Sequence, residues 1–372
     1  MEDWKLIINR APVRAQKSGV AYYVESLIQA LRQSPVRKRV IYHDFGFDIA
    51  PALKTAAISL LGVDLYSHFK TEQYRRSLRR ILSHGGNGRV IYHETNNVPA
   101  AEITVPYLTT LQDLSVFEFP QYHPDYRVRF FEKNFHRTLQ SRWIVVPSEA
   151  TRRDLVRSFS VPAEMIRVVP HGRNPFYQPI DPDRAKTIAR RYTQRPFILY
   201  AGIIEPRKNL SNLILAFERV HKKRDLDLVM AGGYGWLCKD VLRLPARLGL
   251  KNVRFTGYVP EEDLRALYNT AEIFVYPSLL EGFGLPPIEA MSCGLPSILS
   301  RTSSLPEVGA DAALYVDPAS VEEMAQAMLN LLDDIPLRET LRARGLERCR
   351  MFDWNRTASQ MIDIYQELAA EC

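Results

Sequence analysis

Two glutamates, Glu281 and Glu289, bound the segment with the clearest capacity for chemistry, which reads Glu-Gly-Phe-Gly-Leu-Pro-Pro-Ile-Glu. The largely apolar run 271–278 before it ends in Pro-Ser and predicts a buried strand and a turn. A glycine loop carrying Glu281 and a helix carrying Glu289 would follow that strand. A helix start attracts phosphate, whereas carboxylates accept hydrogen bonds from hydroxyl groups. The segment therefore favours a ligand with both groups, such as a nucleotide sugar.

A second candidate site follows the predicted strand 197–201, where Gly202 precedes the adjacent cations Arg207 and Lys208. Side chains at the carboxyl end of a parallel strand face the crevice of an α/β sheet. Two cations there suit a diphosphate, the arginine as a planar fork and the lysine as a point charge. An exposed, solvated pair is the alternative. The flanking strand, glycine and proline favour the binding interpretation.

Weaker candidates follow other predicted strands. Gln112 and Asp113 would point toward the crevice, and so would His93, although a lone histidine is more often structural. Gly19 precedes an apolar helical pattern and either admits a ligand close to the backbone or simply makes a turn. Tyr258 could flank a nucleobase or pack against the core.

Strands alternate with helical patterns in both halves, which predicts parallel α/β sheets. A proline-punctuated stretch from 170 to 182 predicts a crossing between two domains. We expect a first Rossmann-like domain over 1–178, a second over 179–354 and a cleft between them. The last helix, 355–372, has an apolar stripe and would pack back on the first domain. The predicted strands are 5–8, 39–42, 89–92, 107–111, 143–146, 197–201, 227–231, 253–255, 273–276 and 296–299.

Composition narrows the class of protein. The 372 residues carry a net charge of +7, and the first 175 hold 25 basic against 16 acidic residues. The basic segment 74–82 is either a solvated helix face or a surface for an anionic membrane or a phosphate-bearing acceptor. No nucleic-acid-binding module and no metal-ligand cluster is recognisable, so we expect neither nucleic acid nor a metal.

Apolar runs, the N-terminus and the cysteines indicate the cellular compartment of the protein. No apolar run approaches the roughly 20 residues that a membrane span needs, and the N-terminus is unlike a signal peptide. Four scattered cysteines indicate reduced thiols and not a disulfide framework. We expect a cytoplasmic protein, with peripheral contact at the inner face of the cell membrane as an option.

The ordered set of motifs resembles the retaining glycosyltransferase family 4, over nearly the whole chain and most strongly from 143 to 317. Its markers are the 281–289 segment, Glu-Pro-Arg-Lys-Asn at 205–209, Val-Pro-Ser-Glu at 146–149 and Val-Pro-His-Gly at 169–172. The resemblance implies a GT-B fold, with an acceptor-binding first domain and a donor-binding second domain.

The resemblance also implies roles for individual residues. Arg207 and Lys208 would hold the donor diphosphate, Glu289 the ribose hydroxyls and Glu281 the donor sugar, without a metal and without a cofactor. With Asp113, the residues Arg207, Lys208 and Glu281 are the catalytic candidates. The remaining donor-binding candidates are Gly19, Gly202, Tyr258, Gly282, Phe283, Gly284 and Leu285.

One position departs from the family pattern. The family often has His-Asp after the strand 107–111, and this chain has Gln112-Asp113. Glutamine can donate a hydrogen bond but cannot transfer a proton. Gln112, His93 and His171 remain candidate contacts to the donor sugar or the acceptor.

The implied function is transfer of a hexose, mannose or rhamnose favoured, from a nucleotide diphosphate sugar in cell-surface polysaccharide synthesis. The acceptor would be a glycan or a lipid-diphosphate-linked glycan. Two alternatives stay open: a catalytically weak nucleotide-sugar-binding partner subunit, which Gln112 suggests, or another GT-B enzyme such as a sugar-nucleotide epimerase.

Overall fold

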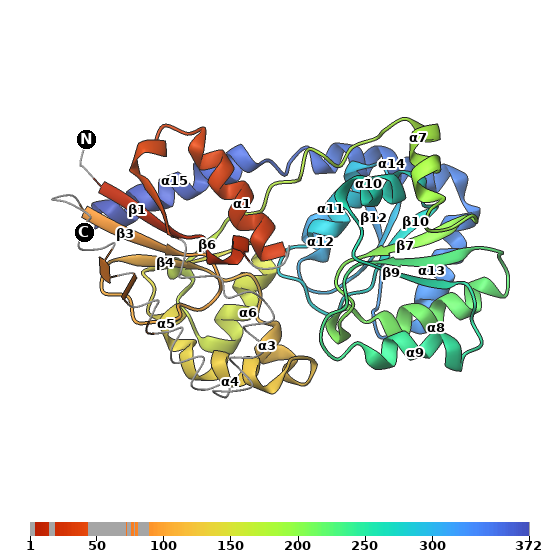
Figure 1. Ribbon diagram of the computed structural model, residues 1–372, viewed down its shortest axis with the longest axis horizontal. Helices are drawn as coiled ribbons and strands as arrows, with labels where there is room; N and C mark the ends of the chain where they lie inside the picture. Colours follow the sequence, from red (N-terminus) through yellow and green to blue (C-terminus); the bar gives the residue numbers. More distant parts are fainter. Residues whose placement is uncertain are drawn as a thin grey trace.

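Two lobes, each built on a parallel six-stranded sheet, lie side by side along the long axis of the computed structural model (Figure 1). The structure describes residues 4–14, 19–43, 72, 76, 77, 79, 80 and 89–371. Most of the basic segment 74–82 lies outside these residues. The predicted α/β class, with two facing Rossmann-like lobes, is confirmed.

The N-terminal sheet has the strand order β2-β1-β3-β4-β5-β6. Its strands are β1 (Trp4–Asn9), β2 (Val40–His43), β3 (Arg89–Glu94), β4 (Tyr107–Thr110), β5 (Trp143–Val146) and β6 (Ile166–Val168). Its helices are η1 (Ala11–Arg14), α1 (Gly19–Arg32), η2 (Arg37–Arg39), α3 (Ser115–Glu118), η3 (Pro120–Tyr122), α4 (Asp125–Asn134), α5 (His136–Leu139), α6 (Glu149–Phe159) and η4 (Ala163–Met165).

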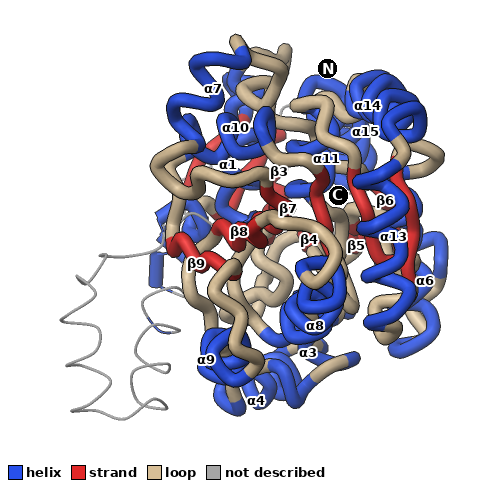
Figure 2. The backbone as a smooth tube through the Cα atoms, turned by 90° about the vertical axis from the view of Figure 1, so that its right-hand side faces the viewer, coloured by secondary structure: helices blue, strands red, loops and turns tan. Residues whose placement is uncertain are grey.

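The C-terminal sheet has the order β12-β11-β10-β7-β8-β9. Its strands are β7 (Phe197–Ala201), β8 (Asp227–Ala231), β9 (Val253–Gly257), β10 (Ile273–Tyr276), β11 (Ser297–Ser300) and β12 (Ala313–Val316). Its helices are α7 (Pro182–Ala189), η5 (Pro206–Lys208), α8 (Leu210–His221), α9 (Lys239–Arg247), α10 (Glu261–Thr270), α11 (Leu285–Ser292), α12 (Leu305–Gly309), α13 (Val321–Asp333) and α14 (Ile335–Cys349). Figure 2 shows the strands in the middle with helices around them.

The last helix, α15 (Trp354–Ala370), returns to the N-terminal lobe, where it packs against α1 and β3. Asp353 caps its start by accepting from the backbone N–H groups of Asn355 and Arg356. Met361, Tyr365 and Leu368 are buried in the core shared with α1. We propose domain boundaries after 178 and after 354 on this arrangement.

The central strands are apolar on both faces, and this is why they could be predicted. All of the residues of β7, β8 and β10 are buried, as a parallel sheet covered by helices requires. The ten predicted strands are all present. The strands β6 and β12, edge strands of three and four residues, were not predicted. Partial exposure weakens their apolar signal, although the edge strands β2 and β9 are also partly exposed and were predicted.

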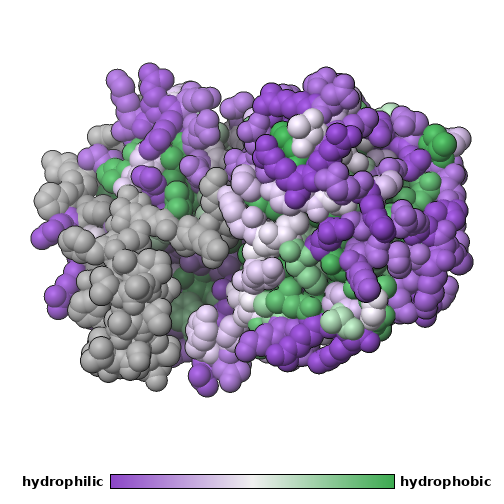
Figure 3. All heavy atoms as spheres, turned by 45° about the vertical axis from the view of Figure 1, so that its right-hand side comes forward, coloured by the Kyte–Doolittle hydropathy of each residue, from purple (hydrophilic) through white to green (hydrophobic). Residues whose placement is uncertain are grey.

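Charged and polar residues dominate the outer surface of the C-terminal lobe in Figure 3, and apolar residues gather toward the middle of the view. Direct contacts join the lobes. The Glu149 backbone N–H donates to the Glu307 carboxylate at 2.8 Å, and Arg153 pairs with the same carboxylate at 3.2 Å. The carboxyl ends of both sheets face this boundary.

Candidate active site

The loop between β10 and α11 carries Glu281 into the interior of the protein. Its shape is fixed by two serines: the Glu281 N–H donates to Ser303 Oγ at 2.9 Å, and Ser304 Oγ donates to the Glu281 and Phe283 carbonyls. Gly284 ends the loop at φ 116°, a conformation that favours glycine, and α11 begins at the next residue. The predicted order of strand, loop and helix is confirmed.

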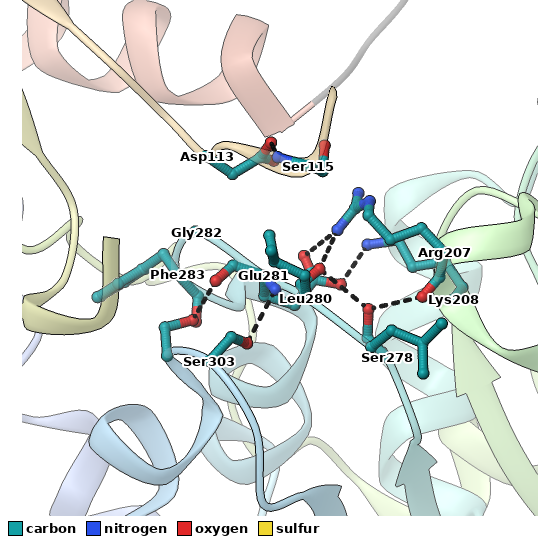
Figure 4. A network of polar contacts seen from close by, with 12 residues as sticks. Asp113, Ser115, Arg207, Lys208, Ser278, Leu280, Glu281, Gly282, Phe283 and Ser303 are labelled. Atoms are coloured by element: carbon teal, nitrogen blue, oxygen red, sulfur yellow. Dashed lines mark hydrogen bonds and ion pairs between the residues drawn. The ribbon is translucent and has the colours of Figure 1, made fainter. Parts of the chain in front are cut away.

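Arg207 and Lys208 reach Glu281 from η5, which follows β7 (Figure 4). Lys208 Nζ lies 2.5 Å from Glu281 Oε1, and Arg207 Nη1 lies 3.1 Å from Oε2. Arg207 also pairs with Glu205 at 2.8 Å, and Lys208 donates to the Tyr276 hydroxyl at 2.8 Å. The three predicted charges therefore form one buried cluster.

The charges of this cluster shift one another's protonation. Burial alone raises the pKa of Glu281, but Arg207 and Lys208 outweigh it and bring the pKa down to about 2. Burial and then repulsion by Arg207 lower the pKa of Lys208. Glu281 is thus an anion at neutral pH and not a proton donor.

Glu289 lies in α11, three residues before the last residue of that helix, and its environment differs from that of Glu281. Tyr268 donates to its Oε2 at 3.1 Å. Burial, with a smaller repulsion from Glu261, raises the pKa of Glu289 to about 7. No cation forms an ion pair with it among the described residues. This carboxyl group can therefore change its protonation near neutral pH.

The N-terminal lobe meets the Glu281 loop at Gln112 and Asp113. A Cβ on Gly282 would lie 1.7 Å from the Gln112 carbonyl oxygen, so only glycine allows this approach. Thr151 Oγ1 also donates to the Gly282 carbonyl at 3.3 Å. Burial raises the pKa of Asp113, but attraction by Arg207 and hydrogen bonds from Ser115 give a net lowering. Asp113 thus adds a third carboxylate near Arg207, after Glu281 and Glu205.

Two histidines are placed differently from the expectation. His93 is fully buried, and its ring nitrogens bond Tyr365 at 2.8 Å and Thr110 at 2.7 Å. His171 is buried and bonds the Gln112 side-chain oxygen through Nε2 at 2.8 Å. Other side chains hold both rings, and a direct contact from either histidine to a ligand stays a prediction. Burial lowers the pKa of each to about 3, so both rings are neutral.

The other predicted donor-binding residues divide into two groups. Gly19, at the start of α1, has open space around it, and Tyr258 is 61% exposed. The φ of Gly202 is 146°, and a Cβ there would lie 2.8 Å from the Tyr200 hydroxyl. The side chains of Phe283 and Leu285 instead pack in an apolar cluster with Ile288 and Met291 of α11, so we expect their backbone to make any contact with the donor.

Several residues at the lobe boundary were not predicted from the sequence. Glu205 and Tyr276 complete the cation cluster, and His123 and Trp236 meet across the lobes at a ring distance of 5.6 Å. Glu205 stands next to the recognised Pro-Arg-Lys, and Trp236 ends a glycine loop after β8, so both carried a local signal. Nothing in the sequence singled out His123, because its environment comes from segments distant in the chain.

A cavity of about 240 Å³ also lies at the boundary, behind Leu279 and Leu280. It is lined by Glu118, Phe119, Ala150, Arg153, Asp154, Arg157, Leu279, Leu280 and Ser303. Its lining excludes the residues of the charged cluster. Within the described ranges, no group of three or more His, Cys, Asp or Glu residues could hold a metal ion. No helix in those ranges is long and apolar enough to span a bilayer.

Family comparisons agree with this geometry. The model of Glycosyltransferase Family 4 matches residues 17–175, and that of Glycosyl transferases group 1 matches residues 182–348. The chain is 38% identical over 268 residues to the O-antigen chain mannosyltransferase B of Escherichia coli, a match that covers 70% of each protein. The chain belongs to glycosyltransferase family 4. It is accordingly a glycosyltransferase.

Two further relatives are matched over less of their length. The serotype-specific mannosyltransferase WbdA of Escherichia coli is 36% identical to this family 4 chain over 193 residues, which are 50% of this chain and 24% of WbdA. The MMP alpha-(1->4)-mannosyltransferase of Mycolicibacterium hassiacum is 31% identical over 61% of this chain and 54% of its own.

Solved structures share the GT-B fold of this family 4 chain. The sucrose-phosphate synthase of Thermosynechococcus elongatus has a TM-score of 0.77 at 21% identity, covering 99% of this chain and 100% of that one. WaaG, a glycosyltransferase involved in lipopolysaccharide biosynthesis, has a TM-score of 0.70 at 15% identity, covering 97% of this chain and 99% of that one. Anabaena Alr3699/HepE, solved with UDP and glucose, has a TM-score of 0.70 at 15% identity, covering 98% of this chain and 99% of that one.

Proposed function

We propose that this protein transfers a hexose, with mannose favoured, from a nucleotide diphosphate sugar to a glycan or lipid-diphosphate-linked glycan during cell-surface polysaccharide synthesis. The observation that carries the proposal is the buried cluster of Arg207, Lys208 and Glu281, with Glu289 in the same nine-residue segment as Glu281. The names of the mannosyltransferase relatives support the choice of sugar and of pathway.

The cation pair is suited to a diphosphate. Lys208 has a lowered pKa because burial and Arg207 oppose its charge, and an added anion would relieve both effects. As the bond to the sugar breaks, negative charge grows on the diphosphate. Two fixed cations within hydrogen-bond reach would stabilise that charge, the task that a metal has in other transferases. We propose metal-independent transfer on this basis.

The two glutamates would recognise hydroxyl groups and not act as an acid–base pair. Glu281 is held ionised by its cations, so it can accept from a sugar hydroxyl while it orients Lys208. Glu289 would accept from the ribose hydroxyls in its ionised form. Asp113, also ionised, would accept from the donor sugar or the attacking hydroxyl. We propose that transfer retains the anomeric configuration, as the family resemblance implies.

Gln112 takes the place of the usual histidine and is oriented by His171. The bond from His171 uses the side-chain oxygen of Gln112, and the Gln112 side-chain nitrogen is buried without a partner in the described part of the chain. That amide would offer N–H donors to a sugar oxygen.

We also propose that the enzyme works in the cytoplasm, with its basic first half toward an anionic membrane face or acceptor diphosphate.

The test is a panel of GDP-, UDP- and dTDP-sugars, scored first by thermal shift and then by transfer to mannose-containing acceptors. A donor that binds only the folded protein raises its unfolding midpoint. We expect GDP-mannose to bind and to be consumed with a glycosylated product. Binding without turnover on any acceptor would contradict the proposal and favour a nucleotide-sugar-binding subunit. An epimerised nucleotide sugar as product would favour the epimerase alternative.

A further inference from the structure

His123 is a buried imidazole that the roles proposed above do not use. It lies between η3 and α4 in the N-terminal lobe and is only 5% exposed. Neither of its ring nitrogens has a hydrogen-bond partner within the described residues. A buried polar atom left without a partner costs about 1–3 kcal/mol, and native proteins rarely tolerate it. Both ring nitrogens are therefore free to bond a group that is not part of the chain.

The facing lobe supplies an aromatic surface to this histidine. Trp236, in the loop after β8, has its ring centre 5.6 Å from that of His123. Its indole N–H donates to the Tyr122 carbonyl at 2.6 Å, which links the two lobes. The guanidinium carbon of Arg127 lies 5.5 Å from the Trp236 ring centre, and Arg127 Nε is also buried without a partner. Polar donors and an aromatic face therefore converge at one place.

The His123 ring lies next to the charged cluster of Arg207, Lys208 and Glu281, but away from Glu289, where the nucleoside of the donor would bind. After burial and Arg127, the groups that shift the pKa of His123 are Asp113, Arg207 and Glu205. The charge of Glu289 instead contributes to the raised pKa of Tyr22 in α1. In Figure 1, α1 lies level with α11, whereas α3 and α4 lie lower, level with α8 and α9. A donor extending from Glu289 to Arg207 would thus leave the His123 side open to the second substrate.

The groups suit an uncharged saccharide better than an anion. Burial lowers the pKa of His123, so its neutral ring carries one donor and one acceptor, which matches a sugar hydroxyl. The carboxylates of Asp113 and Glu205 offset the positive charges of Arg127 and Arg207, so the charges around His123 do not favour a phosphate. The indole can cover the apolar C–H face of a sugar ring while its N–H stays bonded. Because Trp236 belongs to the facing lobe, it covers His123 only while the lobes are in contact.

We propose that His123, Arg127 and Trp236 form a subsite that binds a saccharide unit of the acceptor between the lobes. The subsite rests on the proposed glycosyl transfer. It assigns acceptor recognition to residues of both lobes, so an acceptor would enter before the lobes close on it.

The test measures acceptor KM with GDP-mannose as donor and the methyl glycosides of mannose, mannobiose and mannotriose as acceptors. His123→Ala and Trp236→Ala should each raise the acceptor KM about tenfold, the effect of losing one buried hydrogen-bonding or packing group. The donor affinity of both variants should stay within about twofold. Trp236→Phe, which keeps a ring but loses the N–H, should stay close to wild type in acceptor KM.

Matched controls are His136→Ala on α5 and the exposed Tyr126→Ala on α4, which should leave acceptor KM unchanged. If His123→Ala does not fold, His123→Gln keeps a donor and an acceptor and should retain near-wild-type KM, while Trp236→Ala still tests the subsite.

Three results would overturn the subsite. Wild-type acceptor KM in both folded alanine variants would remove its basis while leaving glycosyl transfer intact. Equal loss in Trp236→Phe and Trp236→Ala would show that the bond to Tyr122, and not the ring, matters. A wild-type protein that transfers sugar from no donor in the panel would overturn the proposed function and the subsite together.

Discussion

Glu281 and Glu289 belong to one nine-residue segment, yet their surroundings drive them in opposite directions. Glu281 contacts two cations and has a pKa lowered to about 2. Glu289 has a tyrosine hydroxyl as its hydrogen-bond donor and a pKa raised to about 7. Both carboxyl groups are largely removed from water, and desolvation raises both pKa values. The difference comes from the cations of η5, which lie beside one glutamate and not the other.

The motif therefore holds two carboxyl groups with different tasks, and they do not act as a pair. A permanently ionised carboxylate suits the cation cluster and a charged leaving group. A carboxyl group that titrates near neutral pH makes the affinity of its ligand depend on pH. Environments that separate the pKa values of two nearby acids generally mark distinct roles.

The largest effect is expected from Glu281→Gln, which leaves Arg207 and Lys208 buried with less opposing charge. Removing one partner of a buried ion pair destabilises a protein by about 3–5 kcal/mol. Transfer activity should fall at least about 100-fold, because the cations lose their orientation. Urea unfolding and product formation measure the two effects. The control is Glu149→Gln, an exposed pair with Arg152, for which we expect less than about 1 kcal/mol. Equal losses in both variants would contradict the distinct role of Glu281.

Gly282→Ala separates the Glu281 loop from the N-terminal lobe. The added methyl group would overlap the Gln112 carbonyl, and overpacking of this kind costs about 1–3 kcal/mol. We expect a lower unfolding midpoint, a wider particle by small-angle scattering and reduced transfer. Gly233→Ala, whose added carbon meets nothing within 4 Å, is the matched control. Unchanged scattering and activity in Gly282→Ala would show that lobe contact here is not needed.

Glu289 should make donor affinity depend on pH. Its carboxylate form accepts hydroxyl hydrogen bonds, and with a pKa of about 7 the ionised fraction rises about tenfold from pH 6 to pH 8. Donor binding should therefore strengthen about tenfold over this range in wild type. Glu289→Gln should bind more weakly and show no such trend. Calorimetric titration at several pH values measures it, and a flat wild-type profile would remove Glu289 from ribose recognition.

Tyr268→Phe gives the smallest and most specific effect. The Tyr268 hydroxyl favours the ionised form of Glu289, so its loss should raise the pKa of Glu289 further. The lost bond is worth about 1 kcal/mol, less than a tenfold change in affinity at neutral pH. The midpoint of the pH profile should move upward, while affinity at high pH recovers. A midpoint that moves downward would contradict the assigned direction of this bond.

Much of the fold could be predicted because it is written in local patterns. Buried central strands such as β7 and β10 are continuous apolar runs, and α15 carries an apolar stripe that reaches Tyr365 and Leu368. The short edge strands β6 and β12 were not predicted; they lack two buried faces, but so do β2 and β9, which were predicted. The same limit applies to His93 and His171. Each follows a recognisable pattern, but whether the ring faces a ligand or the interior depends on partners far along the chain.

The α/β class, the two lobes and the identity of the charged residues follow from the amino-acid sequence, because motif spacing and apolar periodicity are local properties. Which of these charges meet depends on the three-dimensional fold. Arg207 and Lys208 lie more than 70 positions from Glu281, and Gln112 lies farther still from Gly282. Electrostatic and steric effects act over a few ångströms of space and not along the chain. Folding therefore gave two glutamates of one motif opposite pKa shifts and left the ring nitrogens of His123 without a hydrogen-bond partner among the described residues.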